Sequence, residues 1–179
     1  MKVVISLARE PSNPEKPGLR YVSAVAMSYL GPDGELVMKV CHTDDNEDEQ
    51  AMWQGIASVL SRSDVIPYGW NMRTDIWPCI CANMARLNVK CTKLQPLTER
   101  WAKASLGDIS IILNQSAYSQ EAVTEREGAE FLTGESLEFM DESVRFDNPE
   151  QMDCMFNQEH RVLHNLIRQY TECMYEQGK

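Results

Sequence analysis

The segment Tyr68-Gly69-Trp70-Asn71-Met72-Arg73-Thr74-Asp75-Ile76-Trp77-Pro78 decides the fold of this 179-residue chain. A short apolar stretch over residues 64–70 predicts a buried strand, and the spacing of apolar residues over 76–87 predicts a helix. Asn71 and Asp75 therefore lie where a strand gives way to a helix. The rest of the chain can be placed around this junction.

Three strands and a helix precede this junction. We expect strands over residues 3–8, 21–30 and 35–41, and a helix over about residues 47–61. Gly31-Pro32-Asp33-Gly34 lies between the second and third strands and supplies the turn of an antiparallel hairpin. The helix is long enough to serve as a crossover to the next strand.

The pattern is weaker after the junction. Residues 88–105 read as an irregular excursion, residues 106–115 as a strand end or a helix, and residues 119–132 as a helix. The last helix opens at Asn148-Pro149-Glu150, with Asn as the N-cap and Pro at the first helical position. The length predicts one domain over residues 1–179.

Charge is distributed unevenly along the chain. The net charge of −10 argues against binding nucleic acid through the global field. Residues 73–103 carry six basic side chains and two acidic ones, whereas residues 121–179 carry fourteen acids and five basic side chains. This asymmetry predicts single-stranded nucleic acid at the basic segment or a protein partner at the acidic C-terminal half; ordinary solvated helix faces are the alternative.

The sequence predicts no membrane association. No apolar run approaches the ~20 residues that cross a bilayer, and the first residues break off too early for a secretory signal. We therefore expect a cytoplasmic protein whose cysteines are reduced thiols. These are Cys41, Cys79, Cys81, Cys91, Cys154 and Cys173.

The segment from Tyr68 to Pro78 resembles the second exonuclease motif of the DEDD-type 3′–5′ exonucleases, with Thr74 in place of the usual aromatic residue. Residues 106–113, 129–134 and 155–164 are similar to further segments of this family, most closely in proofreading-exonuclease domains related to family B DNA polymerases. The resemblance implies a ribonuclease H-like α/β fold. Its central mixed sheet would combine a three-stranded antiparallel meander with parallel strands and be flanked by helices.

The resemblance also implies where a catalytic site would lie. In this family, an Asp and a Glu spaced D-x-E on the first strand and one Asp in each of motifs two and three hold two metal ions. Ser6 and Ala8 occupy the first-strand positions here, Asp75 matches motif two, and Glu159 replaces the motif-three Asp. Asp75, Glu159 and Asp108 are thus vestigial catalytic residues, and Asp75 and Glu159 are candidate metal ligands.

These substitutions predict the loss of efficient catalysis. A serine hydroxyl is a weak neutral ligand for a hard cation, and an alanine methyl is no ligand. Met155 or Cys154 stands where the family has a Tyr or His base. We expect no cofactor, or weakly bound Mg²⁺ or Mn²⁺. The alternative is an active 3′–5′ exonuclease with a site rebuilt from the remaining carboxylates and Glu10.

The function expected is therefore binding. Candidate nucleic-acid contacts are Asn71, Arg73, Lys90, Lys93 and Arg100. The tryptophans Trp70, Trp77 and Trp101 lie in or beside the basic segment, where they would either stack on bases or fill the core.

His160 and His164 are four residues apart on the last helix. They could bind zinc from one face, with Cys154 nearby in sequence. Because no third ligand follows at motif spacing, we expect them to serve in packing.

Overall fold

The structure is a computed structural model that describes residues 1–9, 22–43, 46–92, 106–110, 124–134 and 148–175. Predictions that fall on Glu10, Lys93, Arg100 and Trp101 lie outside these residues.

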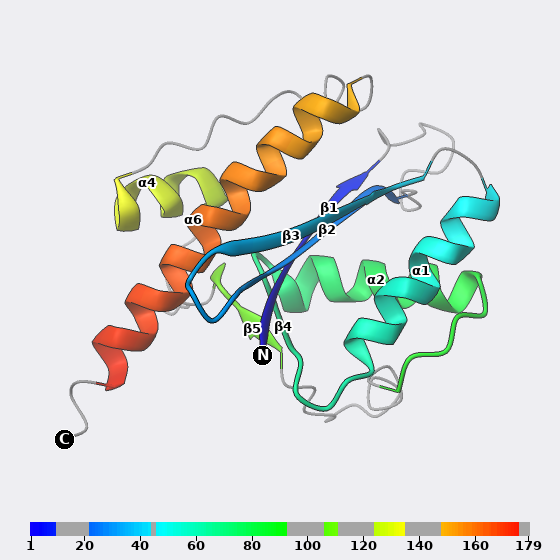
Figure 1. The fold of residues 1–179 in the computed structure, drawn as a ribbon, viewed down its shortest axis with the longest axis horizontal. Coiled ribbons are helices and arrows are strands. Elements are labelled where there is room, and N and C mark those ends of the chain that lie inside the picture. The colour runs from blue at the N-terminus through cyan, green and yellow to red at the C-terminus, as the bar shows by residue number, and fades with distance from the viewer. Residues whose placement is uncertain (10–21, 44–45, 93–105, 111–123, 135–147, 176–179) are drawn as a thin grey trace.

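Five strands form one mixed sheet in the order β3-β2-β1-β4-β5 (Figure 1). β1 (Lys2–Arg9), β2 (Val22–Leu30) and β3 (Leu36–His42) form an antiparallel meander. β4 (Ile66–Gly69) runs parallel to β1, and β5 (Gly107–Asp108) runs parallel to β4. The predicted fold class, a meander extended by parallel strands, is confirmed.

The turn between β2 and β3 has the geometry that its sequence predicts. Gly34 adopts φ 83°, in the left-handed region that glycine enters without steric cost. Its N–H donates to the carbonyl of Gly31 at 3.0 Å, and the N–H of Gly31 donates to the carbonyl of Glu35 at 2.9 Å. These bonds close the hairpin and fix the register of β2 and β3.

Helices cover both faces of the sheet (Figure 1). α1 (Asn46–Leu60) and α2 (Trp77–Arg86) pack on one face, where Trp53 and Ile80 meet Ile5. We call this the α1 face. α4 (Glu125–Thr133) and α6 (Pro149–Tyr175) pack on the other, which we call the α6 face. The α-helices and the β-sheet thus form three layers.

The two-residue period of β1 assigns its side chains to these faces. Val3 and Ile5 belong to the core of the α1 face. Val4 and Ala8 belong to the two apolar clusters of the α6 face. The side chain of Ser6, which lies between Val4 and Ala8 in this alternation, also reaches α6. Positions 6 and 8 therefore share one face, as the D-x-E spacing requires.

The helix after β4 begins earlier than predicted. A π-helical turn, η1 (Met72–Ile76), runs directly into α2, whereas the sequence predicts a helix from residue 76. Asn71 adopts the left-handed conformation (φ 53°, ψ 36°), which Asn tolerates better than most residues. Its carbonyl accepts from the N–H groups of Asp75 at 2.9 Å and Ile76 at 3.3 Å. The chain therefore begins to wind immediately after Asn71.

The caps of the last two described helices account for their starting points. Thr124 and Glu127 form a reciprocal capping box at the start of α4. The side-chain oxygen of Asn148 accepts from the N–H of Gln151 at 3.2 Å, which confirms Asn148 as the N-cap of α6. Of residues 106–115, for which the sequence predicts a strand end or a helix, Gly107 and Asp108 form a strand end, Ser110 is helical, and residues 111–115 lie outside the described residues.

The apolar and thiol side chains follow the sequence interpretation. Trp70 and Trp77 are buried, so they fill the core rather than stack on bases. Cys41, Cys79, Cys81, Cys91 and Cys154 are free thiols. Burial raises the pKa of Cys81 to about 12, which keeps this thiol protonated and unreactive. Among the described helices, none is long and apolar enough to cross a membrane.

Candidate functional site

The site begins with the two positions on β1 where the family would supply acids. Ser6 is buried, and its hydroxyl donates a short hydrogen bond to Oε1 of Glu159 on α6. Ala8 is also buried and packs in an apolar cluster with Met152 and Phe156 of α6. One position thus supplies a hydroxyl that is already hydrogen-bonded, and the other has become part of the hydrophobic core.

Asp75 lies in η1 and is paired with Arg9, the last residue of β1. Their side chains meet at 2.7 Å, with the carboxylate half exposed and Arg9 mostly buried. Burial of the guanidinium opposes its charge, but the hydrogen bond to Asp75 and the charge of that carboxylate outweigh burial and raise the pKa of Arg9. Arg9 therefore stays cationic and acts as the counter-ion of Asp75.

The pairing of β1 with β2 shifts register between Ala8 and Arg9. A bulge of this kind re-aims the side chain that follows it, and here it accompanies the turn of Arg9 towards η1. Sequence reasoning missed Arg9. A sequence signal was available, because Arg9 directly follows Ala8, the position at which the family has a Glu. A positively charged side chain beside a metal site would repel the metal ion, so a basic residue here is unexpected in an active site.

Asp108 holds backbone and hydroxyl groups in place. Its Oδ2 accepts from the N–H of Arg73 at 2.9 Å, and its Oδ1 accepts from the N–H and the hydroxyl of Ser110 at 3.2 and 2.7 Å. The side chain of Arg73 in turn donates to the carbonyl of Leu106 at 3.2 Å. These bonds tie the start of η1 to β5, so Asp108 serves as a structural cap in this arrangement.

The donors present do not fit a pair of divalent cations. Two-metal hydrolysis needs several carboxylates that converge on ions ~4 Å apart. Within the part of the chain that the structure describes, no three His, Cys, Asp or Glu side chains are grouped so that they could hold a metal ion. The carboxylates of Asp75, Asp108 and Glu159 instead each have a partner from the protein.

A second buried polar cluster begins at the residue that follows Glu159 on α6. Ser28 of β2 is within hydrogen-bond distance of Nδ1 of His160 at 2.6 Å and Nε2 of His164 at 2.9 Å. Burial and the neighbouring His164 lower the pKa of His160 to about 3, and burial lowers the pKa of His164 to about 4 despite a hydrogen bond with Ser28. Both imidazoles are therefore neutral near pH 7.

The contacts with Ser28 explain how the two histidines are accommodated in the core without a zinc ion. One ring nitrogen of each histidine lies within hydrogen-bond distance of the Ser28 hydroxyl, and Ser28 is only 1% exposed. With one proton, that hydroxyl donates to one ring and accepts an N–H from the other. The expectation that His160 and His164 serve in packing agrees with this placement. Cys154, the nearby thiol, is exposed.

The residues expected to contact nucleic acid have different surroundings. Asn71, Arg73 and Lys90 are exposed. Arg86, also in the basic segment, forms an ion pair with the buried Glu49 of α1 and so helps to hold α2 against α1. The positively charged surface available here is therefore smaller than the sequence count suggests.

The strand order and the helices on both faces of the sheet give this chain a ribonuclease H-like fold. Two solved structures carry this comparison. A family B DNA polymerase from the hyperthermophilic archaeon Pyrobaculum calidifontis matches 94% of this chain with a TM-score of 0.62 and 13% identity. The zinc-bound complex of E. coli exonuclease I with single-stranded DNA matches 90% of it with a TM-score of 0.54 and 12% identity.

At such identities the similarity establishes the fold. The chain spans 24% of the length of the polymerase and 40% of that of the exonuclease. No protein-family model matches the sequence, and no curated protein matches it.

Proposed function

We propose that this chain is an exonuclease-fold module that has lost efficient phosphodiester hydrolysis and binds single-stranded nucleic acid. One observation carries the first half of the proposal: a hydroxyl and a methyl occupy β1 positions 6 and 8 on the α6 face. A cation brought to this face would meet few uncompensated anions. The carboxylate of Asp75, in turn, is already compensated by the guanidinium of Arg9.

The placement of the remaining carboxylates supports the same conclusion. A rebuilt site would have to draw on Asp75, Asp108 and Glu159, because they are the described acids near the motifs. Recruiting Asp108 would release the N–H of Arg73 and the start of η1 from β5. Recruiting Asp75 would break its ion pair with Arg9. Each step removes an interaction that the fold uses.

Two observations support the nucleic-acid half of the proposal. Arg73 is exposed on η1 and Asn71 is exposed directly before it, beside the carboxyl ends of the parallel strands β1 and β4. The E. coli exonuclease I structure that shares the fold is a complex with single-stranded DNA. An overall acidic chain must bind a phosphate backbone through a local group of this kind.

The hydrolysis half is tested with a 5′-labelled single strand, incubated with the purified protein and Mg²⁺ or Mn²⁺. We expect the strand to keep its length. Progressive shortening that Asp75→Ala abolishes would instead establish the active alternative, with a site rebuilt from Asp75, Asp108 and Glu159.

The binding half is tested by fluorescence anisotropy of a labelled oligothymidine over a series of salt concentrations. Replacing Arg73, Lys90 and Lys93 by Gln should weaken binding and flatten its salt dependence, by a slope of about one for each phosphate that the variant no longer neutralises. Arg168→Gln is the matched control, since Arg168 is exposed on α6 and pairs only loosely with Glu172 at 4.0 Å. An unchanged slope in the triple variant would overturn the proposal and favour a protein partner at the acidic C-terminal half.

A further inference from the structure

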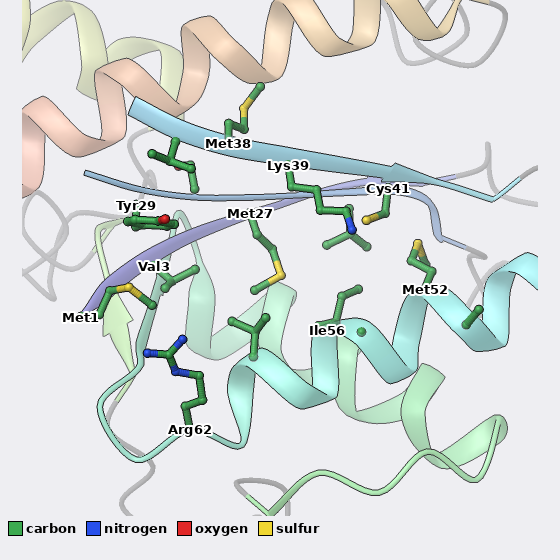
Figure 2. Close-up of a pocket in the computed structure, with 16 residues that line it drawn as sticks. Met1, Val3, Met27, Tyr29, Met38, Lys39, Cys41, Met52, Ile56 and Arg62 are labelled. Atoms are coloured by element: carbon green, nitrogen blue, oxygen red, sulfur yellow. The ribbon is translucent and has the colours of Figure 1, made fainter. Parts of the chain in front are cut away.

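A cavity of about 290 Å³ opens on the α1 face, on the opposite side of the sheet from the candidate site (Figure 2). Its floor consists of the cross-strand pairs Met27–Lys39 and Tyr29–Val37 of β2 and β3. Its wall is α1, which contributes Met52, Gly55, Ile56 and Val59 among others. The cavity is near the lower end of the range of small-molecule pockets, roughly 300–1,000 Å³.

The lining combines an apolar body with positive charge. Most side chains around the cavity are aliphatic or sulfur-containing, and none of the described lining residues is acidic. This is notable in a chain with 27 acidic and 17 basic residues. Lys39 reaches from β3 towards α1, and Arg62 rises towards the sheet from beyond the end of α1 (Figure 2).

Lys39 is the cation available to a ligand. Arg62 is engaged by Asp64 through two hydrogen bonds of 3.1 and 3.0 Å. Lys39 is exposed and has no salt-bridge partner among the described residues. Two apolar residues at the cavity, Met1 and Val37, are 39% and 44% exposed, so apolar surface continues outwards.

We propose that this cavity binds a small organic anion with an apolar body, whose anionic group contacts Lys39. The apolar body gains from leaving water for an apolar cavity. The anionic group selects the ligand through Lys39, in the way that a few polar groups orient ligands in otherwise apolar pockets. This site lies outside the proposed nucleic-acid function and shares no residue with it.

Two dyes with the same rings test the proposal on the whole chain. One is 8-anilinonaphthalene-1-sulfonate, which carries one sulfonate, and the other is the uncharged N-phenyl-1-naphthylamine. We expect saturable binding of both to the folded protein. Lys39→Met should weaken binding of the sulfonate roughly threefold to fivefold, the size of a partly exposed ion pair, and leave the uncharged dye unaffected.

A second variant fills the cavity. A Cβ added at Gly55 meets no heavy atom within 4 Å, so Gly55→Leu would extend into open space at the cavity wall. It should reduce the affinity for both dyes at least tenfold. Because Leu favours a helix over Gly, the melting temperature should not fall. Ser58→Leu adds the same side chain at an exposed position of α1 that does not line the cavity, and should leave binding unchanged.

Three results would overturn the proposal. Dye binding that survives Gly55→Leu would place the dyes elsewhere. If Lys39→Met weakened the binding of both dyes equally, Lys39 would not recognise the anionic group. A concentration-dependent dimer in sedimentation velocity that Gly55→Leu disrupts would make a second copy of the chain the occupant of this face.

Discussion

The two faces of the sheet differ in whether their side chains leave space and polar groups free to bind a ligand. On the α6 face, buried polar groups bind one another: Ser6 with Glu159, and Ser28 with His160 and His164. On the α1 face the lining is apolar, and a cavity of about 290 Å³ remains open beside Lys39. The polar side chains of the α6 face are therefore engaged with one another, while the α1 face has room for a ligand.

The difference follows from the cost of burying polar groups. A buried hydroxyl, imidazole or carboxylate needs a partner, and loss of that partner costs about 1–3 kcal/mol or more. The polar residues on the α6 face are accordingly held in hydrogen-bonded sets, although Nε2 of His160 has no partner among the described residues. Apolar side chains around an opening carry no such requirement. Perturbation of the α6 face should consequently cost much more stability than perturbation of the α1 face.

The largest effect is expected from Ser6→Asp, which places a second carboxylate directly beside Glu159. Two carboxylates would then share a buried position, and the free energy of unfolding should fall by about 3–5 kcal/mol. Urea denaturation measures the change, with Ser58→Asp at an exposed position of α1 as the control, expected within about 0.5 kcal/mol of the parent. If Mn²⁺ restored the free energy of unfolding of Ser6→Asp to that of the parent, the two carboxylates would form a metal site, contrary to our expectation.

Acidification should produce the next largest effect, through the two buried histidines. Burial, and for His160 the neighbouring His164, keep their folded pKa values at about 3 for His160 and about 4 for His164, below the ordinary 6.5. Below pH 6.5 the unfolded chain therefore binds more protons, and stability falls as the pH falls. Between about pH 7 and pH 5.5 the loss should be about 2–3 kcal/mol for the pair.

Histidine variants assign this pH dependence. His164→Gln should remove about half of the slope, measured by urea denaturation at each pH. His42→Gln changes the remaining histidine, which lies on β3 beside Asp153, and serves as the control. If His164→Gln left the pH dependence of the free energy of unfolding unchanged, the neutral form of His164 in the folded protein would not be its source.

Much of the fold could be predicted from local patterns. The hairpin at Gly31–Gly34 and the N-cap at Asn148 depend on residues close in sequence, so turn and cap chemistry identified them. The π-helical turn after Asn71 was not predicted, because helical periodicity marks the apolar face rather than the residue at which winding begins.

The candidate site was predicted less completely, since its partnerships join residues far apart in sequence. The resemblance placed Ser6 and Ala8 at the missing acids, and the strand period places both on the α6 face. The pairs Arg9–Asp75 and Ser28–His160 join positions 66 and 132 residues apart. Without the register of the sheet, no sequence pattern connects them.

Alanine substitutions at two glycines, one on each face, test how tightly the two faces are packed. A Cβ at Gly107 on β5 would lie 2.1 Å from the ring of Tyr68, which packs on the α6 face. Gly107→Ala should therefore destabilise the protein by about 1–3 kcal/mol. Gly55→Ala on α1 meets no atom within 4 Å and should stabilise it by about 0.5–1 kcal/mol through helix propensity. Thermal unfolding measures both, and equal signs would remove the contrast between the faces.

The smallest effect is expected at the carboxyl end of β1, where Arg9 meets the half-exposed Asp75. Because solvent screens this pair, Arg9→Gln should lower the free energy of unfolding by about 1 kcal/mol or less. A double-mutant cycle with Asp75→Asn isolates the pair from the packing of the arginine stem. Coupling that shrinks as salt is added would support Arg9 as the counter-ion of Asp75, since exposed charge pairs are screened. Zero coupling at low salt would instead leave Asp75 available to another cation, and the end of β1 would then offer an uncompensated carboxylate.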